Sequence, residues 1–399
     1  MNLTGCRVIA LLNSIETFGQ EKGNLEVFKS LRRMGAEVHV GINALEDGGD
    51  VGNAVRNLGF ECFRLPFGGQ WSKKLFRREP RRIYQSFLSV IRCSRILRSR
   101  IAALNATHIH VANPLVYSYV YNALKSSHLP LIYRMGDAPP LDSPPNLMIW
   151  KSCVARSSRV VANSEYVRRS ISLAAPKSNG KLQLIYNVAP EFSGCSPARP
   201  STASMSTRNN SDPLHLLYVG QLMQHKGIED LLEAATRLLT SGKVFVLDIV
   251  GGSIYSEDYQ QVLRDRVLSA GLHHRILFHG HVANPASHYA GADLLIVPSH
   301  CQEGAPNVVL EAKQWGIPSV VYPSGGLPEL VTHQENGFVC REKSVEALVE
   351  GLQWYLDAPG RLTAARVAAF HDSETRFGRD RYEQQWGAVY MQSLASNKR

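Results

Sequence analysis

The chain is 399 residues long, with 44% apolar and 20% charged residues and a formal net charge of +10. It is long enough for two domains with full hydrophobic cores, and its composition is that of an ordinary soluble globular protein. No apolar run approaches the roughly 20 residues of a membrane-spanning helix, and single, scattered cysteines without a C-x-x-C pair exclude a disulfide framework or a zinc site of that type.

The first elements along the chain are predicted to form a strand-helix-strand unit. Residues 7–13 have the apolar pattern of a strand, a loop follows through Gly19, and a helix ends at Gly35 before a second strand at residues 37–42. The apolar run near the N-terminus is too short for a signal peptide and lacks a basic flank, so we expect the chain to stay in the cytosol.

The rest of the first half continues this alternation. Helical patterns separate short apolar strands, which are predicted at residues 61–65, 107–111, 131–134, 159–162 and 182–186. Residues 1–175 are therefore predicted to form a Rossmann-like domain, a doubly wound parallel sheet with helices on both faces.

A strongly basic stretch lies inside the first half. Residues 71–100 carry ten Lys or Arg against one Glu, which favours an anionic partner such as a membrane surface, a phosphorylated lipid or nucleic acid. From Pro80 onwards, apolar residues follow helical spacing with arginines on the other faces. Two interpretations stay open: a packed helix with a solvated basic face, or an interfacial patch in which Trp71 and Phe76 lie near lipid and the arginines near headgroups.

A change of composition separates the two halves. Residues 176–213 contain one apolar strand and then a tract rich in Ser, Pro, Asn and Arg that cannot bury a core. We interpret this segment as an interdomain linker with a flexible tract. A second domain is predicted over residues 214–375, and a terminal helix with recurring large aromatic residues is predicted over residues 376–399.

The first loop of the second domain has a glycine at each end. A strand at residues 214–219 leads into Gly220-Gln-Leu-Met-Gln-His-Lys-Gly227, and a helix follows. Lys226 lies where a cation could meet a phosphate above the helix start. The next strand ends at Gly251, in a turn that lets the backbone approach a ligand closely, and a further strand precedes Val282.

Two glutamates with seven residues between them mark the candidate ligand site. Glu303 follows an apolar run that predicts a buried strand, and Glu311 lies inside a helix predicted over residues 307–314. Open α/β sheets bind ligands at this carboxyl edge, and an ionised carboxylate can accept bonds from two sugar hydroxyls. The backbone at the helix start is a candidate seat for a phosphate, and it comprises Gly304, Ala305, Pro306, Asn307 and Val308.

The sequence around the two glutamates carries more information than their spacing, which chance produces in many proteins. Residues 298–318 are PSHCQEGAPNVVLEAKQWGIP, and this frame resembles the donor-binding signature of the retaining GT-B glycosyltransferases, in particular family 4. The resemblance implies two facing Rossmann-like domains, with the donor bound by the second and the acceptor by the first. It also implies a terminal helix that crosses back to the first domain.

The resemblance further implies roles for single residues. Lys226 would stabilise charge on the departing diphosphate, Glu303 would orient the sugar hydroxyls, and Glu311 would bind the ribose. The loop with Gly19 would face the diphosphate, although one glycine stands where the family usually has two. The strand exit at Val282 would hold the nucleotide base through backbone contacts.

Two positions depart from the family pattern. The motif G-R-x-x-x-x-K-G appears with Gly220 but with Gln221 in place of the arginine, which removes a cation from the diphosphate. Family members often carry a histidine after a first-domain strand, whereas this chain has Arg134 and Asp137 as the nearest polar residues. We assign both to the substrate, with Asp137 as a catalytic candidate.

The expected reaction is the retaining transfer of a sugar from a nucleoside-diphosphate sugar to a saccharide or lipid-linked saccharide in surface polysaccharide synthesis. No D-x-D motif is present, so we expect no required metal and no cofactor beyond the donor. We expect a cytoplasmic protein, peripheral at the inner face of the cell membrane if the basic patch binds lipid, and no nucleic-acid partner. The alternative is a nucleotide-sugar-binding subunit without transferase activity.

Overall fold

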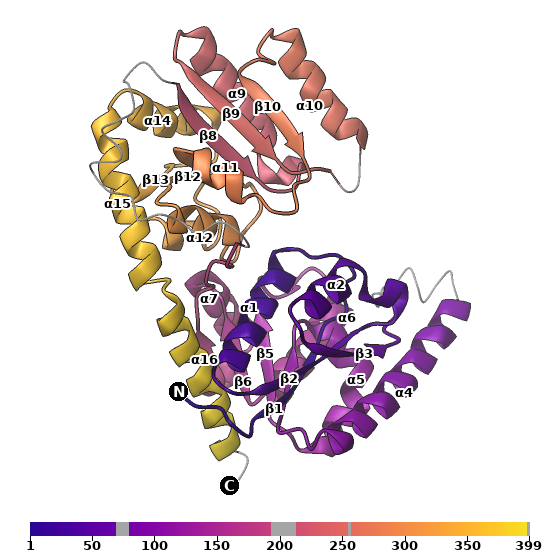
Figure 1. Ribbon diagram of the computed structural model, residues 1–399. Helices are drawn as coiled ribbons and strands as arrows, with labels where there is room; N and C mark the ends of the chain where they lie inside the picture. Colours follow the sequence, from indigo (N-terminus) through magenta and orange to yellow (C-terminus); the bar gives the residue numbers. More distant parts are fainter. Residues whose placement is uncertain (69–79, 193–212, 254–256, 397–399) are drawn as a thin grey trace. The chain divides into compact units, whose positions relative to one another are not determined.

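The computed structural model describes residues 1–68, 80–192, 213–253 and 257–396. The chain divides into two compact units, one formed by Met1–Tyr186 with Asp380–Arg399 and the other by Asn187–Arg379. Each unit holds a parallel sheet covered by helices (Figure 1), which confirms the predicted α/β class with two doubly wound domains.

The sheet of the first unit consists of parallel strands in the order β3-β2-β1-β4-β5-β6-β7. The strands are β1 (Arg7–Leu11), β2 (Glu37–Asn43), β3 (Glu61–Leu65), β4 (His108–Val111), β5 (Leu131–Met135), β6 (Arg159–Ala162) and β7 (Leu182–Leu184). Val8 pairs with Val38 on one side and with His108 on the other. Because helices cover both faces, the central strands are buried along their length: β1 is apolar from Val8 to Leu11, and β4 buries His108 and His110 among its apolar residues.

Several helices of the first unit begin with proline or after a capping residue. The helices of this unit are α1 (Gly19–Arg33), η1 (Leu45–Gly48), α2 (Gly49–Asn57), α4 (Pro80–Ala103), α5 (Pro114–Ser127), α6 (Pro144–Arg156), α7 (Glu165–Ala174), η2 (Pro176–Lys181) and α16 (Arg379–Ser396). The side chains of Asn113 and Ser164 accept hydrogen bonds from backbone N–H groups in the first turns of α5 and α7. These caps fix where the chain turns from strand into helix.

The predicted linker over residues 176–213 begins too early. The strand β7 pairs with β6 and belongs to the first sheet, and the first unit continues to Tyr186. An apolar strand next to a buried parallel strand gains ladder hydrogen bonds that a linker would leave to water. The Ser-, Pro-, Asn- and Arg-rich tract at residues 193–212 lies outside the described residues.

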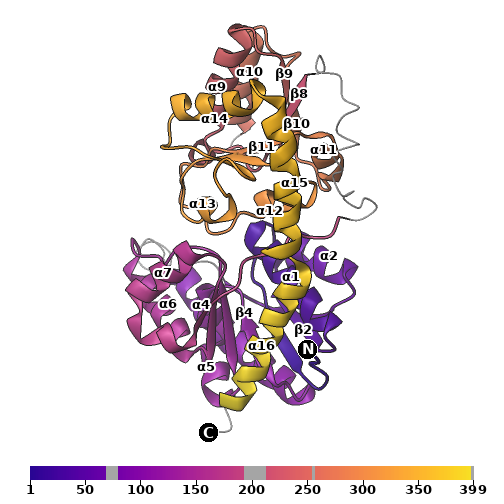
Figure 2. The same cartoon turned by 90° about the vertical axis from the view of Figure 1, so that its left-hand side faces the viewer.

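The terminal helix α16 runs along the first unit (Figure 2), and a buried polar and aromatic network holds it on the sheet. A ring nitrogen of His108 lies 3.0 Å from the hydroxyl of Ser393, and one of His110 lies 2.8 Å from the hydroxyl of Tyr390. The other ring nitrogen of His110 lies 3.1 Å from the side-chain oxygen of Asn24 in α1. Burial lowers the pKa of His108 to about 4 and that of His110 to about 3, so both rings are neutral at pH 7.

The sheet of the second unit has the order β10-β9-β8-β11-β12-β13, again parallel. Its strands are β8 (Leu214–Val219), β9 (Phe245–Val250), β10 (Ile276–Gly280), β11 (Leu294–Val297), β12 (Ser319–Val321) and β13 (Gly337–Val339). Its helices are η3 (Gln224–Lys226), α9 (Ile228–Thr240), α10 (Glu257–Ser269), α11 (Ala286–Gly291), α12 (Asn307–Gln314), α13 (Leu327–Leu330), α14 (Val345–Leu356) and α15 (Pro359–Thr375). The bounds of α12 confirm the helix predicted there.

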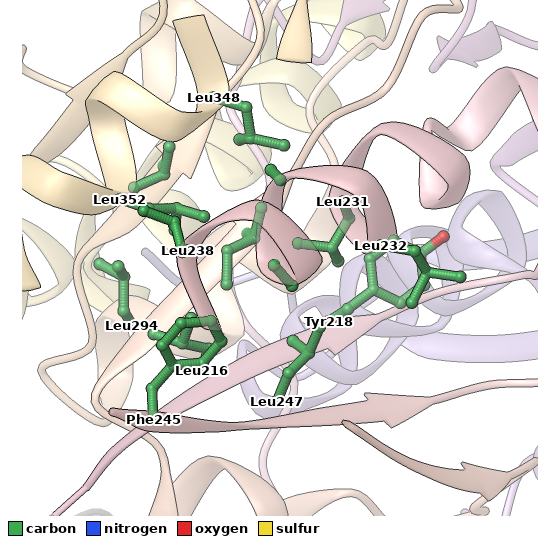
Figure 3. Close-up of a cluster of buried hydrophobic side chains, with 14 of the residues drawn as sticks. Leu216, Tyr218, Leu231, Leu232, Leu238, Phe245, Leu247, Leu294, Leu348 and Leu352 are labelled. Carbon is green, nitrogen blue, oxygen red and sulfur yellow. The ribbon is translucent and has the colours of Figure 1, made fainter. Parts of the chain in front are cut away.

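Leucines from strands and helices fill the core of the second unit (Figure 3). Leu216 and Leu247 from the sheet meet Leu231 and Leu238 from α9 and Leu348 from α14, and all are buried. Each such side chain contributes roughly 1.5–3 kcal/mol relative to an exposed one. This core holds β8 and α9 rigidly, so the loop between them has fixed ends.

Each sheet contains one point where the strand order reverses. In the first unit it lies between β1 and β4, and in the second between β8 and β11. Loops that leave two adjacent strands in opposite directions create a crevice at the carboxyl edge, which is where open α/β sheets bind ligands.

None of the described helices combines the length and the apolarity needed to cross a bilayer.

Candidate active site

The two residues predicted to act on the donor meet at the switch point of the second unit. Lys226 ends η3, directly after β8, and Glu303 lies on the loop after β11. The ammonium nitrogen of Lys226 is 2.6 Å from Oε1 of Glu303, and the hydroxyl of Ser299 donates to the same oxygen at 2.8 Å. Both charged side chains are only partly exposed, at 26% and 16%. The cation and the carboxylate therefore form one preorganised charged group.

Close backbone packing between the two loops sets this pair. The carbonyl oxygen of His225 accepts hydrogen bonds from the N–H groups of His300 and Cys301, at 2.9 and 3.1 Å. Gly227 has a φ of 72°, and a Cβ atom there would overlap the carbonyl oxygen of Pro298. Only glycine fits both the left-handed conformation and the close approach. The glycine after Lys226 thus holds the lysine against the glutamate loop.

A third loop supports Glu303 from behind. The N–H group of Gly326 donates to the carbonyl oxygen of Glu303 at 2.8 Å. Gly325 has a φ of 57°, and a Cβ atom there would overlap that same oxygen. This contact from the loop after β12 fixes the backbone that carries the Glu303 carboxylate.

Glu311 has a different environment from Glu303. Its side chain is only 3% exposed, and one oxygen accepts a hydrogen bond of 2.7 Å from the hydroxyl of Tyr289 in α11. Burial and the adjacent carboxylate raise the pKa of Tyr289 well above its ordinary value, so the phenol stays a donor. The helix that carries Glu311 is anchored by a buried ion pair between Lys313 and Asp372 of α15, at 2.8 Å.

The segment between the two glutamates has its shape fixed by a residue that the sequence analysis missed. The side-chain amide of Asn187 donates to the carbonyl oxygen of Ala305 at 3.0 Å and to the side-chain oxygen of Asn307 at 2.8 Å. Gly304 is buried as well, whereas Pro306 and Val308 are half-buried. Pro306 is the N-cap of α12 and makes no side-chain capping bond. An asparagine directly after the apolar run 182–186 was the available signal.

The remaining predicted donor residues follow the carboxyl ends of β8, β9 and β10, at the same edge of the sheet as Lys226. Gly251 has a φ of 144°, and a Cβ atom there would overlap the carbonyl oxygen of Gly220. The close approach found at this turn is to Gly220, and the approach to a ligand stays a prediction. The carbonyl oxygen of Gln221 accepts a bond of 2.9 Å from Tyr218, and Val282 is half-buried after β10.

A pocket of about 460 Å³ opens at the switch point of the first unit. Its wall includes Asn13 after β1, Asn113 after β4 and Asp137 after β5, together with Glu21 from α1. Gly19, the exposed first residue of α1, is not part of the wall. The predicted catalytic candidate Asp137 thus lies in the crevice that the topology marks.

Arg134 lies on the other face of β5 and is not part of the pocket wall. It is 2% exposed, and its guanidinium occupies the space beneath Gly23 of α1, where a Cβ atom would overlap it. It interacts electrostatically with Tyr382, Asp137 and Glu21. From this position Arg134 can influence a ligand through Asp137 and Glu21, but it does not reach the pocket itself.

Glu21 is a pocket residue that the sequence analysis did not find. It is buried, and burial raises the pKa of its carboxyl, while a hydrogen bond from the backbone N–H of Phe18 opposes that change. Its signal in the sequence is its position as the third helical residue after the N-cap, where a carboxylate closes a capping box.

The described residues contain no group of three or more His, Cys, Asp or Glu side chains that could hold a metal ion. The expectation that the reaction needs no metal ion stays a prediction, because only a measurement of activity can test it.

Two family models match separate parts of the chain. Glycosyltransferase Family 4 matches residues 19–189, and Glycosyl transferases group 1 matches residues 202–370. The chain belongs to the group 1 glycosyltransferase family. The second match includes Lys226, Glu303 and Glu311, and the first includes Asp137 and the pocket wall from α1 onwards.

Relatives and solved structures agree with this assignment. This glycosyltransferase family member is 28% identical over 211 residues to an uncharacterized glycosyltransferase of Methanocaldococcus jannaschii, covering 52% of this chain and 51% of the relative. It is 31% identical over 134 residues to a lipopolysaccharide core biosynthesis mannosyltransferase of Rhizobium meliloti, covering 33% and 38%. The chain thus spans about half or less of the length of these curated relatives.

Among solved structures, the chain resembles Anabaena HepE in complex with UDP and glucose. The TM-score is 0.77 with 20% sequence identity, and the match covers 97% of this chain and 100% of the other. This likeness establishes the GT-B fold that the sequence frame implied.

Proposed function

We propose that the protein transfers a sugar from a nucleoside-diphosphate sugar to a saccharide acceptor, with retention of the anomeric configuration. The observation that carries the proposal is the contact between Lys226 and Glu303 at the switch point of the second unit. A lysine is a compact cation suited to phosphate, and a carboxylate is an acceptor suited to hydroxyls. Their contact keeps Glu303 from repelling a diphosphate bound beside it.

In this reaction the bond between the sugar C1 and the diphosphate oxygen breaks and a new bond from C1 to the acceptor oxygen forms. The proton of the acceptor hydroxyl passes to the departing diphosphate oxygen. Lys226 would stabilise the negative charge on the departing diphosphate, helped by the N-terminus of α12. Glu303 would hold the sugar hydroxyls, and Glu311 the ribose. Asp137 would orient the acceptor hydroxyl within the first-unit pocket.

The donor assignment draws support from the solved neighbour that contains UDP and glucose. Gln221 gives this chain a diphosphate site with fewer cations than the family pattern has. An arginine at that position would add a second cation for the diphosphate, so Lys226 carries more of the binding here. We propose that catalysis needs no metal ion, which predicts unchanged turnover in excess chelator.

The test of the proposal is incubation of the purified full chain with a panel of nucleotide sugars and membrane-derived acceptors. We expect release of a nucleoside diphosphate with one donor, an α-linked product from an α-linked donor by NMR, and near-complete loss of turnover in Lys226→Ala. Tight donor binding without turnover under all conditions would instead support the alternative, a nucleotide-sugar-binding subunit.

For the acceptor we propose a lipid-linked saccharide presented at a membrane surface. One relative acts in lipopolysaccharide core biosynthesis by its name. In this chain, Tyr84, Phe87 and Ile91 of α4 are 66%, 61% and 47% exposed and lie at positions i, i+3 and i+7 of the helix. Apolar side chains at this spacing share one helix face, and burying them in a bilayer interface would stabilise binding.

Exposed arginines lie on the same helix as this apolar face. Arg81, Arg92, Arg95 and Arg98 are all exposed on α4, which matches the anionic headgroups of a membrane. Trp71 and Phe76, which the sequence analysis placed near lipid, lie outside the described residues. The opposite face of α4 packs into the first unit through Cys93 and Leu97, so the helix has an inner and an outer side.

Vesicle binding tests the membrane surface. The assay is co-sedimentation with vesicles in which about one headgroup in three is anionic. The double variant Phe87→Ser, Ile91→Ser should bind these vesicles several-fold more weakly than the parent. Leu268→Ser on α10 removes an equally exposed apolar side chain from the second unit and should bind normally. Equal binding of all three proteins would leave the solvated-face interpretation of this stretch.

A further inference from the structure

The first-unit pocket has a wall rich in carboxamides whose positions are fixed by hydrogen bonds. The side-chain oxygen of Asn13 accepts a bond of 2.6 Å from Asn113, and the side-chain nitrogen of Gln20 donates at 2.6 Å to the carbonyl oxygen of Ala112. Within the described residues, the remaining side-chain atoms of these two residues, Nδ2 of Asn13 and Oε1 of Gln20, make no hydrogen bond. The pocket wall thus offers one hydrogen-bond donor, Nδ2 of Asn13, and one acceptor, Oε1 of Gln20. A hydroxyl group can both donate and accept, so it could bind to either.

Apolar surface adjoins these polar groups. Tyr133, Met135 and Trp150 are buried and belong to the same wall. Sugars combine hydroxyls with an apolar C–H face, and a site with a few placed polar groups on an apolar wall is complementary to both. At about 460 Å³ the pocket has room for one or two sugar rings.

The charge of the pocket is negative. Glu21 and Asp137 are the charged residues of its wall, and none of the described wall residues is a lysine, arginine or histidine. Arg134 lies behind the wall beneath α1 and interacts with both carboxylates. Even with that arginine counted, two carboxylates and one guanidinium leave a formal charge of −1. An anionic group in the pocket would be repelled, whereas an amine would be attracted.

We infer that this pocket binds the reacting sugar of the acceptor and that it selects a sugar that is neutral or carries an amine, against one that carries a phosphate or a carboxylate. The inference rests on the proposed function, since it takes the first unit to bind the acceptor. The selection concerns the ring inside the pocket only, so a phosphate farther along a lipid-linked acceptor is compatible with it.

Ligand-observed NMR titrations of the full chain, without nucleotide sugar, test the selection. The probes are methyl glycosides, 2-amino sugars, sugar 6-phosphates and uronates, each in the gluco, galacto and manno series. For at least one series we expect the neutral or amino sugar to bind at least tenfold more tightly than the phosphate or uronate. An anionic sugar that binds as tightly as its neutral counterpart, or no binding by any probe, would overturn the inference.

Two variants locate the effect in the pocket. Asp137→Asn should reduce the preference against phosphate at least threefold, while Asp142→Asn, which neutralises an exposed carboxylate outside the pocket wall, should leave it unchanged. Asn146→Arg adds a cation to the wall on α6 and should raise the affinity for the sugar 6-phosphate, which keeps the test decisive if Asp137→Asn folds poorly. Equal preferences in all four proteins would also overturn the inference.

Calorimetry with nucleotide sugars separates this inference from the proposed function. If a nucleotide sugar binds and is turned over while the pocket shows no selection, only the acceptor inference fails. If no nucleotide sugar binds or reacts, the proposed function fails whatever the monosaccharide titrations give.

Discussion

The two switch points of this molecule differ in electrostatic character, since one holds an ion pair and the other holds carboxylates. In the second unit Lys226 contacts Glu303 beside the start of a helix, which offers both a cation and a hydroxyl acceptor. In the first unit the pocket wall holds Glu21 and Asp137 and, among the described wall residues, no cation. The same topology creates both places, so the fold fixes where ligands bind and a few side chains fix which chemistry they have.

The buried groups that hold the elements beside the two switch points also differ in charge. The helix that carries Glu311 is held by the buried ion pair of Lys313 and Asp372. Beside the first switch point, β4 is held by the neutral rings of His108 and His110 against α16. A buried neutral histidine stabilises a fold only while it stays unprotonated, so the first unit should be the more sensitive to acid.

Acid unfolding is the largest effect we expect. The pKa of His108 and of His110 is about 4 and about 3 in the folded chain, below the ordinary value of 6.5. Below pH 6.5 the unfolded chain therefore binds more protons, and stability falls as the pH falls toward the folded values. Each histidine should cost about 2 kcal/mol of unfolding free energy at pH 5.

Urea titrations at pH 7 and pH 5 measure this loss, followed by a probe in the first unit. The double variant His108→Gln, His110→Gln should show a shallower pH dependence than the parent. His281→Gln, which replaces an exposed histidine, should behave like the parent. Equal pH dependence in all three proteins would contradict a role for the buried pair.

Removal of the second-unit cation should have the next largest effect. In Lys226→Ala nothing replaces the charge that faces the departing diphosphate, and we expect kcat to fall about 10²- to 10³-fold. Lys243→Ala removes a surface lysine paired with Asp357 and serves as the matched control. Steady-state kinetics with the preferred donor decide this, and a fall of less than fivefold would argue against the assigned role.

A pair of glycine variants tests how the site is held together. Gly227 and Gly242 both have positive φ, but only at Gly227 would a Cβ atom meet another loop. Gly242→Ala should cost about 1 kcal/mol of unfolding free energy, as usual for this conformation. Gly227→Ala should cost about 3 kcal/mol because the contact with Pro298 is lost as well. Equal costs in denaturant titrations would mean that the loop contact is unimportant.

The smallest effect that we expect is a gain in affinity for a nucleoside diphosphate. Gln221→Arg introduces the arginine that the family pattern has at this position, and we expect about five- to tenfold tighter binding of a nucleoside diphosphate. The hydroxyl of Tyr218 donates to the backbone carbonyl oxygen of Gln221 and not to its side chain, so this bond should survive the change. Calorimetry measures the gain, and unchanged affinity would show that the side chain at this position points away from the diphosphate.

Much of the second-unit site could be predicted from the sequence, because its residues follow strands that a periodic apolar pattern reveals. Parallel strands end at one edge, so Lys226 after β8 and Glu303 after β11 had to lie near each other once the fold class was known. The helix bounds of α12 followed from Pro306 and Gly316 for the same local reasons.

The first-unit site was less predictable because its contacts join distant segments. Arg134 sits in an apolar strand, and only the gap left by Gly23 of α1 explains how its charge is buried. In the second unit, Asn187 was missed for the same reason, since it holds a segment about 120 residues away in the chain and no local pattern encodes that contact. The linker boundary failed for a similar reason, since a short strand gains its stability only from a neighbour in the sheet.

Calorimetric titration of the preferred nucleotide sugar into the parent and three variants separates the roles of the two switch points. We expect Lys226→Ala and Glu311→Ala each to weaken binding at least about tenfold, while Asp137→Asn in the first-unit pocket stays within twofold of the parent. Unchanged affinity in the two second-unit variants, with a loss in Asp137→Asn, would contradict the division of labour between the two switch points.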